Sequence, residues 1–261
     1  DPPLAVTARS VDGNSAPASR DLGVITAPFT VERLRPLVAK PARPAPFSLR
    51  LSSAPKLRME IAATTFWILL AVAVTGLTFV FRSLPDRWMG ITLAMGIALV
   101  ATAGLDAVRR RLKPALFPVV VGLLAGVLQV GITLAATAFF PFVWPEWETA
   151  ARALYAWSKG HSTLFLGSTL VMVVIAEEML WRGVVARFLI ERWGKGLGIV
   201  SGAAIFALAH WAAFNPLLLF AAFVCGLFWG WLYAATDDLV TPTVSHLVWD
   251  TMLFFVFPVA R

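Results

Sequence analysis

The chain has 261 residues, of which 59% are hydrophobic and 14% are charged. This composition is more apolar than a soluble core of that length needs, so it excludes an ordinary soluble domain and indicates a polytopic membrane protein. The formal net charge of +7 does not indicate a nucleic-acid partner, because residues 1–58 hold nine Lys and Arg against four Asp and Glu, whereas the remainder holds thirteen against eleven.

The first segment, residues 1–58, is rich in Pro, Ala, Ser and Arg and has no long apolar periodicity. Such a segment cannot bury enough apolar surface to offset the entropy of folding, so we expect a disordered tail. The apolar run after Arg58 is longer than the core of a secretory signal peptide and long enough to cross a bilayer. It is therefore expected to be the first membrane span.

Further apolar runs follow, each about 20 residues long, which is the length that crosses a bilayer as a helix. The predicted fold is all-α, a polytopic membrane protein of about seven transmembrane helices. The expected spans lie near residues 61–81, 88–107, 115–140, 163–189, 197–214, 217–235 and 239–257.

Basic residues flank alternate loops between these runs. By the positive-inside rule they place the N-terminus in the cytoplasm and the C-terminus outside. The clusters that set this orientation are Lys56 and Arg58; Arg109, Arg110, Arg111 and Lys113; and Arg187, Arg192 and Lys195.

Shorter features lie between and within the spans. The stretch Trp144–Trp157 interleaves charged and apolar residues, which predicts an amphipathic helix in the outer interface. Gly122–Gly126 and Gly226–Gly230 have GxxxG spacing, which permits close contact between helices. Gly194–Gly198 lacks the Lys-Ser/Thr ending of a phosphate loop and follows no strand, so it indicates a tight cytoplasmic turn.

Ionisable residues occur inside the later spans, where they are costly and are functional by default. Glu178 and Arg182 are four residues apart, so on a helix they share a face and can form an ion pair. Glu177 is then available as a general base or acid.

The same spacing of four recurs in Phe206 with His210 on one span, and in His246 with Asp250 on the last. At about 1.5 Å per residue, Glu177 and His210 reach depths within a turn or two of each other, and His246 lies nearer mid-membrane. The non-catalytic interpretation is a set of satisfied polar contacts between helices, as in a scaffold or a transporter.

The runs Glu177-Glu-Met-Leu-Trp-Arg182, Phe206-Ala-Leu-Ala-His210 and His246-Leu-Val-Trp-Asp250 fit EExxxR, FxxxH and HxxxN/D, in that order. In this respect the chain resembles the CPBP family, the CAAX-processing and bacteriocin-processing intramembrane proteases. The resemblance extends from about Ser162 to Phe257, the four-helix core of that family. It implies a catalytic core at 161–261, which leaves 1–58 as the disordered tail and 59–160 as accessory and interfacial helices.

The resemblance implies a glutamate-dependent endopeptidase without a cofactor, in the bacterial inner (cytoplasmic) membrane. Glu177 and His210 would activate a water, and His246 and Asp250 would bind the oxyanion. Glu178, Arg182 and Phe206 would support them. The implied substrate is a membrane-anchored or lipid-modified protein or peptide. Many relatives have Asn at the position of Asp250, and an ionised Asp repels an oxyanion unless it is protonated or acts by orienting His246.

Alternatives remain at this stage. Glu177, His210, His246 and Asp250 offer nitrogen and oxygen ligands for Zn²⁺ with an open water position, although the sequence has no HExxH pairing. A non-proteolytic scaffold of the same family is the second alternative. The single cysteine, Cys225, excludes an intrachain disulfide and a thiolate metal cluster.

Overall fold

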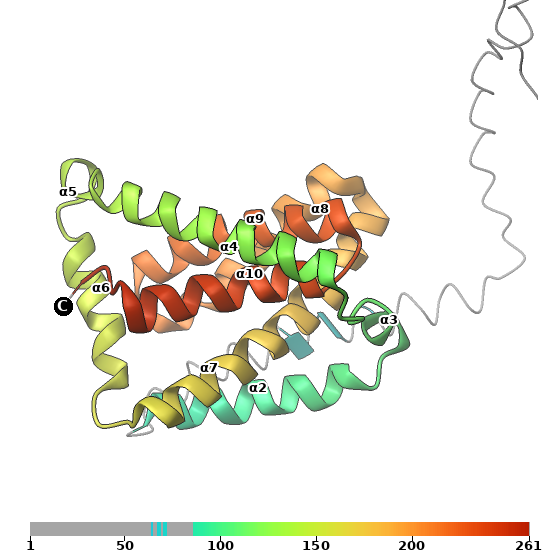
Figure 1. Ribbon diagram of the computed structural model, residues 1–261, viewed down its shortest axis with the longest axis horizontal. Coiled ribbons are helices and arrows are strands. Elements are labelled where there is room, and N and C mark those ends of the chain that lie inside the picture. The colour runs from blue at the N-terminus through green and yellow to red at the C-terminus, as the bar shows by residue number, and fades with distance from the viewer. Residues whose placement is uncertain (1–63, 65–66, 69, 72–85, 261) are drawn as a thin grey trace, which may run out of the picture. The chain divides into compact units, whose positions relative to one another are not determined.

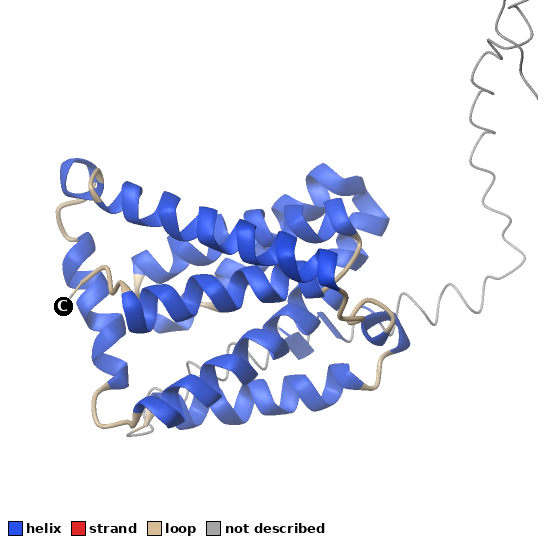
Figure 2. Ribbon diagram, in the orientation of Figure 1, coloured by secondary structure: helices blue, strands red, loops and turns tan. Residues whose placement is uncertain are grey.

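The computed structural model describes residues 64, 67–68, 70–71 and 86–260. The predicted tail and most of the first predicted span lie outside these residues. Within residues 86–260 every regular element is a helix and no strand is present (Figure 2). The prediction of an all-α fold is therefore confirmed.

The helices follow one another with short connections (Figure 1). Among the described residues, the label η marks helices that are not α-helical: η5 and η7 are π-helical, and η4 and η6 are short 3₁₀ turns. The elements are α2 (Arg87–Ala103), α3 (Asp106–Arg109), α4 (Leu116–Thr137), α5 (Phe140–Val143), α6 (Trp147–Tyr155), η4 (Ala156–Ser158), α7 (Thr163–Glu177), η5 (Glu178–Ala186), α8 (Arg187–Ala209), η6 (Trp211–Ala213), α9 (Pro216–Thr236), α10 (Val240–Thr251) and η7 (Met252–Val256).

Within the described residues, three helical stretches are long and apolar enough to cross a membrane: Leu116–Thr137, Thr163–Ala209 and Pro216–Thr236. The apolar helix α2, with 17 residues, is shorter. Apolar helices of this kind are those of an integral membrane protein. The count of seven spans stays a prediction.

The 47-residue stretch Thr163–Ala209 is two helices joined at Gly194, whose φ of 80° and ψ of 168° are not helical. A residue with a side chain rarely adopts this left-handed φ, which is why glycine stands there. The chain then folds back closely, since a Cβ on Gly198 would lie 2.5 Å from the Cα of Ile190. The predicted turn after the fourth span is thus present.

The helices that carry the polar residues pack against each other in pairs: α4 along α10, α8 along α9, and α2 along α7 (Figure 1). The contact between α4 and α10 is close because of the first GxxxG pair. A Cβ on Gly122 would lie 2.7 Å from the Thr241 carbonyl oxygen, and one on Gly126 would lie 2.7 Å from the Val248 Cβ. Only glycine lets the two backbones approach this far.

The predicted interfacial helix is α6, which buries Trp147 and Ala151 and exposes an ion pair between Glu148 and Arg152. The Asn215 side chain caps α9 and donates from Nδ2 to the Ala150 carbonyl oxygen at 2.8 Å, which ties α6 to α9.

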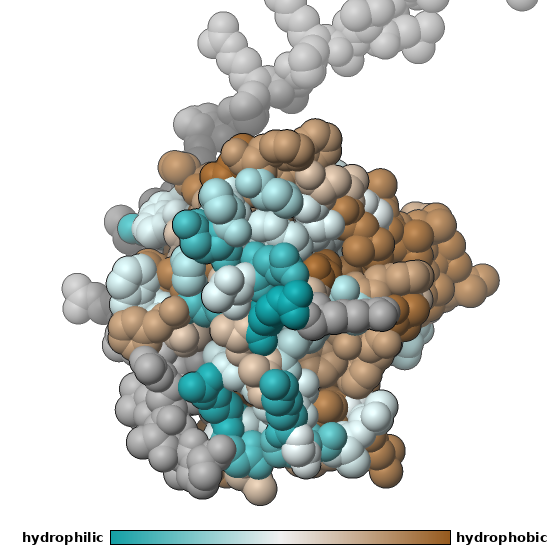
Figure 3. All heavy atoms as spheres, turned by 90° about the vertical axis from the view of Figure 1, so that its left-hand side faces the viewer, coloured by the Kyte–Doolittle hydropathy of each residue, from teal (hydrophilic) through white to brown (hydrophobic). Residues whose placement is uncertain are grey.

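The end of the molecule that carries α6 and the C-terminus is seen in Figure 3, where hydrophilic residues gather in the middle and hydrophobic residues lie beside them. Helix α4 exposes large apolar side chains along its length, as a helix facing lipid does. These side chains include Leu116, Phe117, Leu124, Val127, Leu128 and Ile132.

Candidate active site

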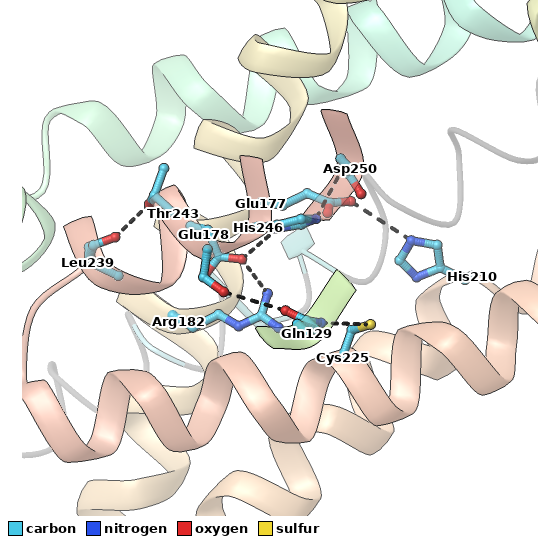
Figure 4. A network of polar contacts seen from close by, with 11 residues as sticks. Gln129, Glu177, Glu178, Arg182, His210, Cys225, Leu239, Thr243, His246 and Asp250 are labelled. Carbon is cyan, nitrogen blue, oxygen red and sulfur yellow. Dashed lines mark hydrogen bonds and ion pairs between the residues drawn. The ribbon is translucent and has the colours of Figure 1, made fainter. Parts of the chain in front are cut away.

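The last residue of α7, Glu177, lines a cavity of about 230 Å³ together with His210, His246 and Asp250. These residues come from three segments: the end of α7, the residue that follows α8, and the second half of α10. The structure thus brings together the four residues that the sequence predicts as catalytic. Their arrangement is shown in Figure 4.

The contact between Glu177 and His210 is loose. The His210 Nε2 atom lies 3.8 Å from Glu177 Oε1, which is longer than a direct hydrogen bond. The His210 Nδ1 atom lies 2.8 Å from the Phe206 carbonyl oxygen. Because a carbonyl oxygen only accepts, Nδ1 is the donor, so a neutral imidazole presents the lone pair of Nε2 towards Glu177. A single water can hydrogen-bond to both groups across such a gap.

The neighbouring carboxylate, Glu178, lies in a tight and fully buried cluster. Its Oε1 accepts from Arg182 Nη1 at 2.9 Å and from His246 Nδ1 at 2.8 Å. The exposed fractions of Glu178, Arg182 and His246 are 0%, 2% and 4%. The predicted ion pair is present, and the contact with His246 is one that the sequence did not suggest. It connects the EExxxR and HxxxD segments.

Both nitrogens of the His246 ring face carboxylates. Nδ1 contacts Glu178, and Nε2 lies 3.5 Å from Asp250 Oδ2. The ring itself stacks on the Trp229 indole, with centroids 3.6 Å apart and planes inclined by 22°. His246 is therefore fixed by a hydrogen bond, an ion-pair contact and an aromatic face.

Trp229, on α9, is 1% exposed and also lines the cavity. The Arg182 guanidinium carbon lies 5.1 Å from its ring centroid and 4.8 Å from that of Phe206, so two aromatic faces hold the cation. Sequence reasoning identified Phe206 and missed Trp229, because a tryptophan within an apolar run has no distinguishing spacing.

A second polar network comes from α4, a helix that the sequence analysis places among the accessory spans. Gln129 Nε2 donates to Cys225 Sγ at 3.3 Å, and Ser245 Oγ donates to Gln129 Oε1 at 3.4 Å. One turn further along α4, Thr133 Oγ1 accepts from the Trp249 indole nitrogen at 2.9 Å. Gln129 and Thr133 thus hold α10 from a helix outside the segment predicted as the catalytic core. A polar residue inside an apolar span was the signal that could have found Gln129.

The metal alternative can be compared with this arrangement. Among the residues that the structure describes, no group of three or more His, Cys, Asp or Glu side chains lies close enough to hold a metal ion. Both nitrogens of His246 already face carboxylates, at 2.8 and 3.5 Å. As arranged, the four residues do not fit a zinc site with three protein ligands converging on one point.

A larger cavity of about 410 Å³ shares Asp250, Trp249 and Cys225 with the cavity that Glu177 lines. Its other walls are mostly apolar and come from α4, α6, α9 and η7. The four candidate residues therefore lie beside a mostly apolar space that α6 helps to enclose.

His161 lies just before the start of α7, and its sequence position suggests no partner. In the structure it contacts Asp86, which directly precedes α2. Its Nε2 lies 3.2 Å from Asp86 Oδ1, and its ring stacks on Phe165 at 5.0 Å. Asp86 also caps α2 by accepting from the Met89 backbone N–H. His161 therefore joins the starts of α2 and α7 and takes no part in the cavity.

These features define a helical integral membrane protein whose acidic and imidazole side chains meet in a buried cavity between helices. Residues 159–252 match the family model of type II CAAX prenyl endopeptidase Rce1-like proteins. The predicted family is confirmed over this segment, which contains all the motifs, and the match supports a CAAX-protease-like membrane endopeptidase. Neither a curated protein nor a solved structure matches the chain.

Proposed function

We propose that the protein is an intramembrane endopeptidase that hydrolyses a peptide bond with a water activated by Glu177 and His210. The observation that carries this proposal is the separation between the Glu177 and His210 side chains. Glu177 and His210 face each other at 3.8 Å in a cavity, beside His246 and Asp250. A carboxylate and an imidazole at this separation can hold a water between them and remove its proton.

The reaction follows from these positions. The water oxygen bonds to the carbonyl carbon of the substrate, and its proton passes to Glu177. The carbonyl oxygen becomes an oxyanion, which N–H donors of the cavity stabilise. The C–N bond then breaks, the departing nitrogen takes the proton from Glu177, and the products are a carboxylic acid and an amine, which ionise to a carboxylate and an ammonium. His210, held by the Phe206 carbonyl oxygen, keeps the water oriented.

The proposed substrate is a membrane-anchored or lipid-modified protein or peptide. The catalytic centre is buried among apolar helices and opens onto a mostly apolar cavity, so the segment beside the cleaved bond must itself enter apolar surroundings. A freely soluble, highly charged peptide would lose its hydration there without compensation.

We further propose the bacterial inner membrane as the location, with the N-terminus in the cytoplasm. The basic residues of the Arg109–Lys113 loop and of the turn at Gly194 lie at one end of the helices, and the interfacial helix α6 lies at the other. Residues of α6 and of the start of α2, Leu154 and Trp88, line the catalytic cavity. In this orientation the cavity is approached from the outer side.

The test compares the membrane proteomes of cells that make the wild-type protein, Glu177→Gln or Glu191→Gln at equal levels. Glu191 is an exposed residue of α8 paired with Arg187, so its substitution is the matched control. Wild-type protein and Glu191→Gln should generate the same new N-termini in membrane proteins, and Glu177→Gln should generate none. Identical termini with and without Glu177 would contradict the proposal and favour a non-proteolytic scaffold.

A further inference from the structure

The hydrogen-bond partners of His246 decide how many protons its ring carries. Its Nδ1 atom lies 2.8 Å from Glu178 Oε1, and its Nε2 atom lies 3.5 Å from Asp250 Oδ2. An ionised carboxylate only accepts hydrogen bonds, so a nitrogen that faces one is satisfied as an N–H donor. A neutral imidazole has one N–H group, whereas an imidazolium has two. Both contacts are therefore satisfied together when His246 is a cation.

The charges around His246 favour the same state. Glu178 and Asp250 contact the ring, Glu177 lines the same cavity, and Arg182 is the cation paired with Glu178. With the three carboxylates ionised, one guanidinium leaves an excess of two negative charges in a buried cluster. A cationic His246 reduces this excess to one, and uncompensated charge is costly in buried surroundings.

The ring of His246 lies face to face with the Trp229 indole. The two centroids are 3.6 Å apart, and the planes are inclined by only 22°. Two neutral aromatic rings prefer offset or edge-on arrangements with centroids about 4.5–7 Å apart, because the negative faces of their π systems repel each other. A cation over an indole face is instead attracted by that negative charge. The geometry is thus that of an imidazolium on a π face.

The indole that carries this face is itself held on several sides. Trp229 is 1% exposed, Trp249 contacts its ring edge-on at 5.8 Å and 79°, and the Arg182 guanidinium carbon lies 5.1 Å from its centroid. Trp229 belongs to α9, whereas Glu178 belongs to η5 and His246 to α10. The edge of the imidazole ring is therefore fixed by η5 and its own helix, and its face is fixed by a third element.

We propose that Trp229 is a positioning residue, whose π face holds His246 as an imidazolium and keeps an N–H group of that ring available to the oxyanion. The Nε2–H of His246 is directed at Asp250, and at 3.5 Å that contact is long enough for a substrate oxygen to share the donor. Trp229 transfers no proton and forms no bond. This inference rests on the proposed endopeptidase function.

Fluorination of the indole tests the contact while keeping the shape of the residue. Fluorine is close to hydrogen in size, and it withdraws electrons from the ring, so each added fluorine weakens the attraction of the π face for a cation. Monofluoro-, difluoro- and tetrafluorotryptophan replace Trp229 alone in otherwise identical proteins.

Trp181 provides the matched control for this series. It is equally buried, at 2% exposed, and packs edge-on against Phe206. It lines neither of the two cavities, and among the described residues no cation lies over its ring. The same fluorinated residues at Trp181 therefore change a buried indole without changing a contact with His246.

The first readout is kcat and KM of each protein reconstituted in lipid vesicles. The substrate is a fluorogenic peptide spanning a cleavage site mapped in the membrane-proteome comparison. Fluorination of Trp229 should lower kcat stepwise, by about 2- to 30-fold for the whole series, which is the range of a cation–π contact. KM should stay unchanged, because the contact supports the transition state. The series at Trp181 should retain the wild-type kcat.

The second readout is unfolding in detergent, which does not depend on cleavage. Each fluorinated protein is compared with the same protein carrying His246→Gln, whose side chain cannot become a cation. Fluorination of Trp229 should lower the unfolding midpoint more when His246 is present than when it is replaced. The contact of Trp229 with Arg182 is common to both backgrounds and does not contribute to this difference. If His246→Gln does not fold, the kcat series decides alone.

The possible outcomes separate the two proposals. An unchanged kcat across the Trp229 series, with active wild-type enzyme, overturns the inference and leaves the endopeptidase function intact. An equal fall of kcat in the Trp181 series also overturns it, as does an equal loss of stability with and without His246. No cleavage by wild-type protein overturns the endopeptidase function and the positioning role of Trp229 with it.

Discussion

Glu177 and Glu178 are adjacent in the sequence and have opposite surroundings. Glu177 faces a cavity and lies 3.8 Å from its nearest described basic group, His210. Glu178 is fully buried and accepts two contacts shorter than 3 Å, from Arg182 and His246. Two carboxylates one residue apart can therefore serve separate purposes, because successive residues of a helix point in different directions. Glu177 lines the cavity, and Glu178 connects η5 to α10 through His246.

The largest expected effect is the loss of activity when the cavity carboxylate is removed. Glu177→Gln should lower kcat about 10²- to 10⁴-fold, the contribution typical of a general base, because an amide cannot take the proton of the water. Its thermal unfolding temperature should equal that of wild type. Both quantities are measured on purified protein in vesicles.

His210→Ala should also lower kcat, since it removes the second group that holds the water. Wild-type cleavage by either variant at equal protein levels would rule out the glutamate–histidine mechanism. Glu178→Gln completes the comparison, and it should lower the unfolding temperature where Glu177→Gln does not.

The next effect concerns stability. Glu178→Ala leaves the buried Arg182 and His246 without their shared partner, which should cost about 3–5 kcal/mol of unfolding free energy, the value for a broken buried ion pair. Glu178→Ala/Arg182→Ala should recover part of this loss, because the unpaired cation is gone. The recovery should be incomplete, since His246 still lacks its acceptor. The measurement is folded yield and reversible unfolding in detergent.

A double variant that is no more stable than Glu178→Ala or Arg182→Ala alone would show that the two side chains are not energetically coupled.

A smaller effect is expected from the network on α4. Gln129→Leu removes the acceptor of Ser245 and the donor to Cys225, and it should cost about 1–3 kcal/mol through the buried hydroxyl left unpaired. Activity should fall less than with Glu177→Gln, because Gln129 acts only by holding α10. Gln129→Glu, which keeps an acceptor for Ser245, is the matched control. Equal stability of wild type and Gln129→Leu would show that the network does not hold α10.

The smallest effect is expected at Asp250. Asp250→Asn keeps the shape of the side chain and its contact with His246, and it removes a negative charge from the cavity. Cleavage should be retained or raised. Metal content is measured on the same purified protein, because a zinc ligand would behave differently. Lost activity together with one bound Zn²⁺ per wild-type chain would favour a metalloprotease.

The parts of the molecule that depend on local spacing could be predicted. The i,i+4 pair of Glu178 and Arg182, the turn at Gly194 and the amphipathic helix α6 each follow from residues close in the chain, and the structure contains all three. The all-α fold and the family are confirmed as well. The division into accessory and core segments and the catalytic roles of Glu177, His210, His246 and Asp250 stay predictions.

The parts that depend on packing between distant segments could not be predicted. The contact of Glu178 with His246 joins residues 68 positions apart, and that of Gln129 with Ser245 joins residues 116 positions apart. Such contacts are set by how far two backbones approach, which Gly122 and Gly126 decide for α4 and α10. Spacing along one helix carries no information about which residue of another helix lies opposite.

The end of the molecule that carries α6 has its own fixed contact. The Tyr155 hydroxyl donates to the Leu253 carbonyl oxygen at 2.8 Å and accepts from the Val259 backbone N–H at 3.3 Å. Burial raises the pKa of this phenol, so it stays protonated and keeps donating at physiological pH. Helix α6 is thereby joined to the end of the chain that follows Asp250.

The π-helical segment η5 makes the site respond differently to changes of chain length on its two sides. It begins at Glu178, directly after Glu177, and its turns hold more residues than those of an α-helix. Deleting one residue from it, so that it closes into an α-helix, would leave the helices before and after it in nearly the same register. Deleting one residue from the regular part of α8 before Gly194 would instead rotate everything after the deletion by about 100°. The turn at Gly194 would then start in a new direction, and the helix carrying His210 with it. A deletion in this part of α8 should thus lower activity more than a deletion that closes η5.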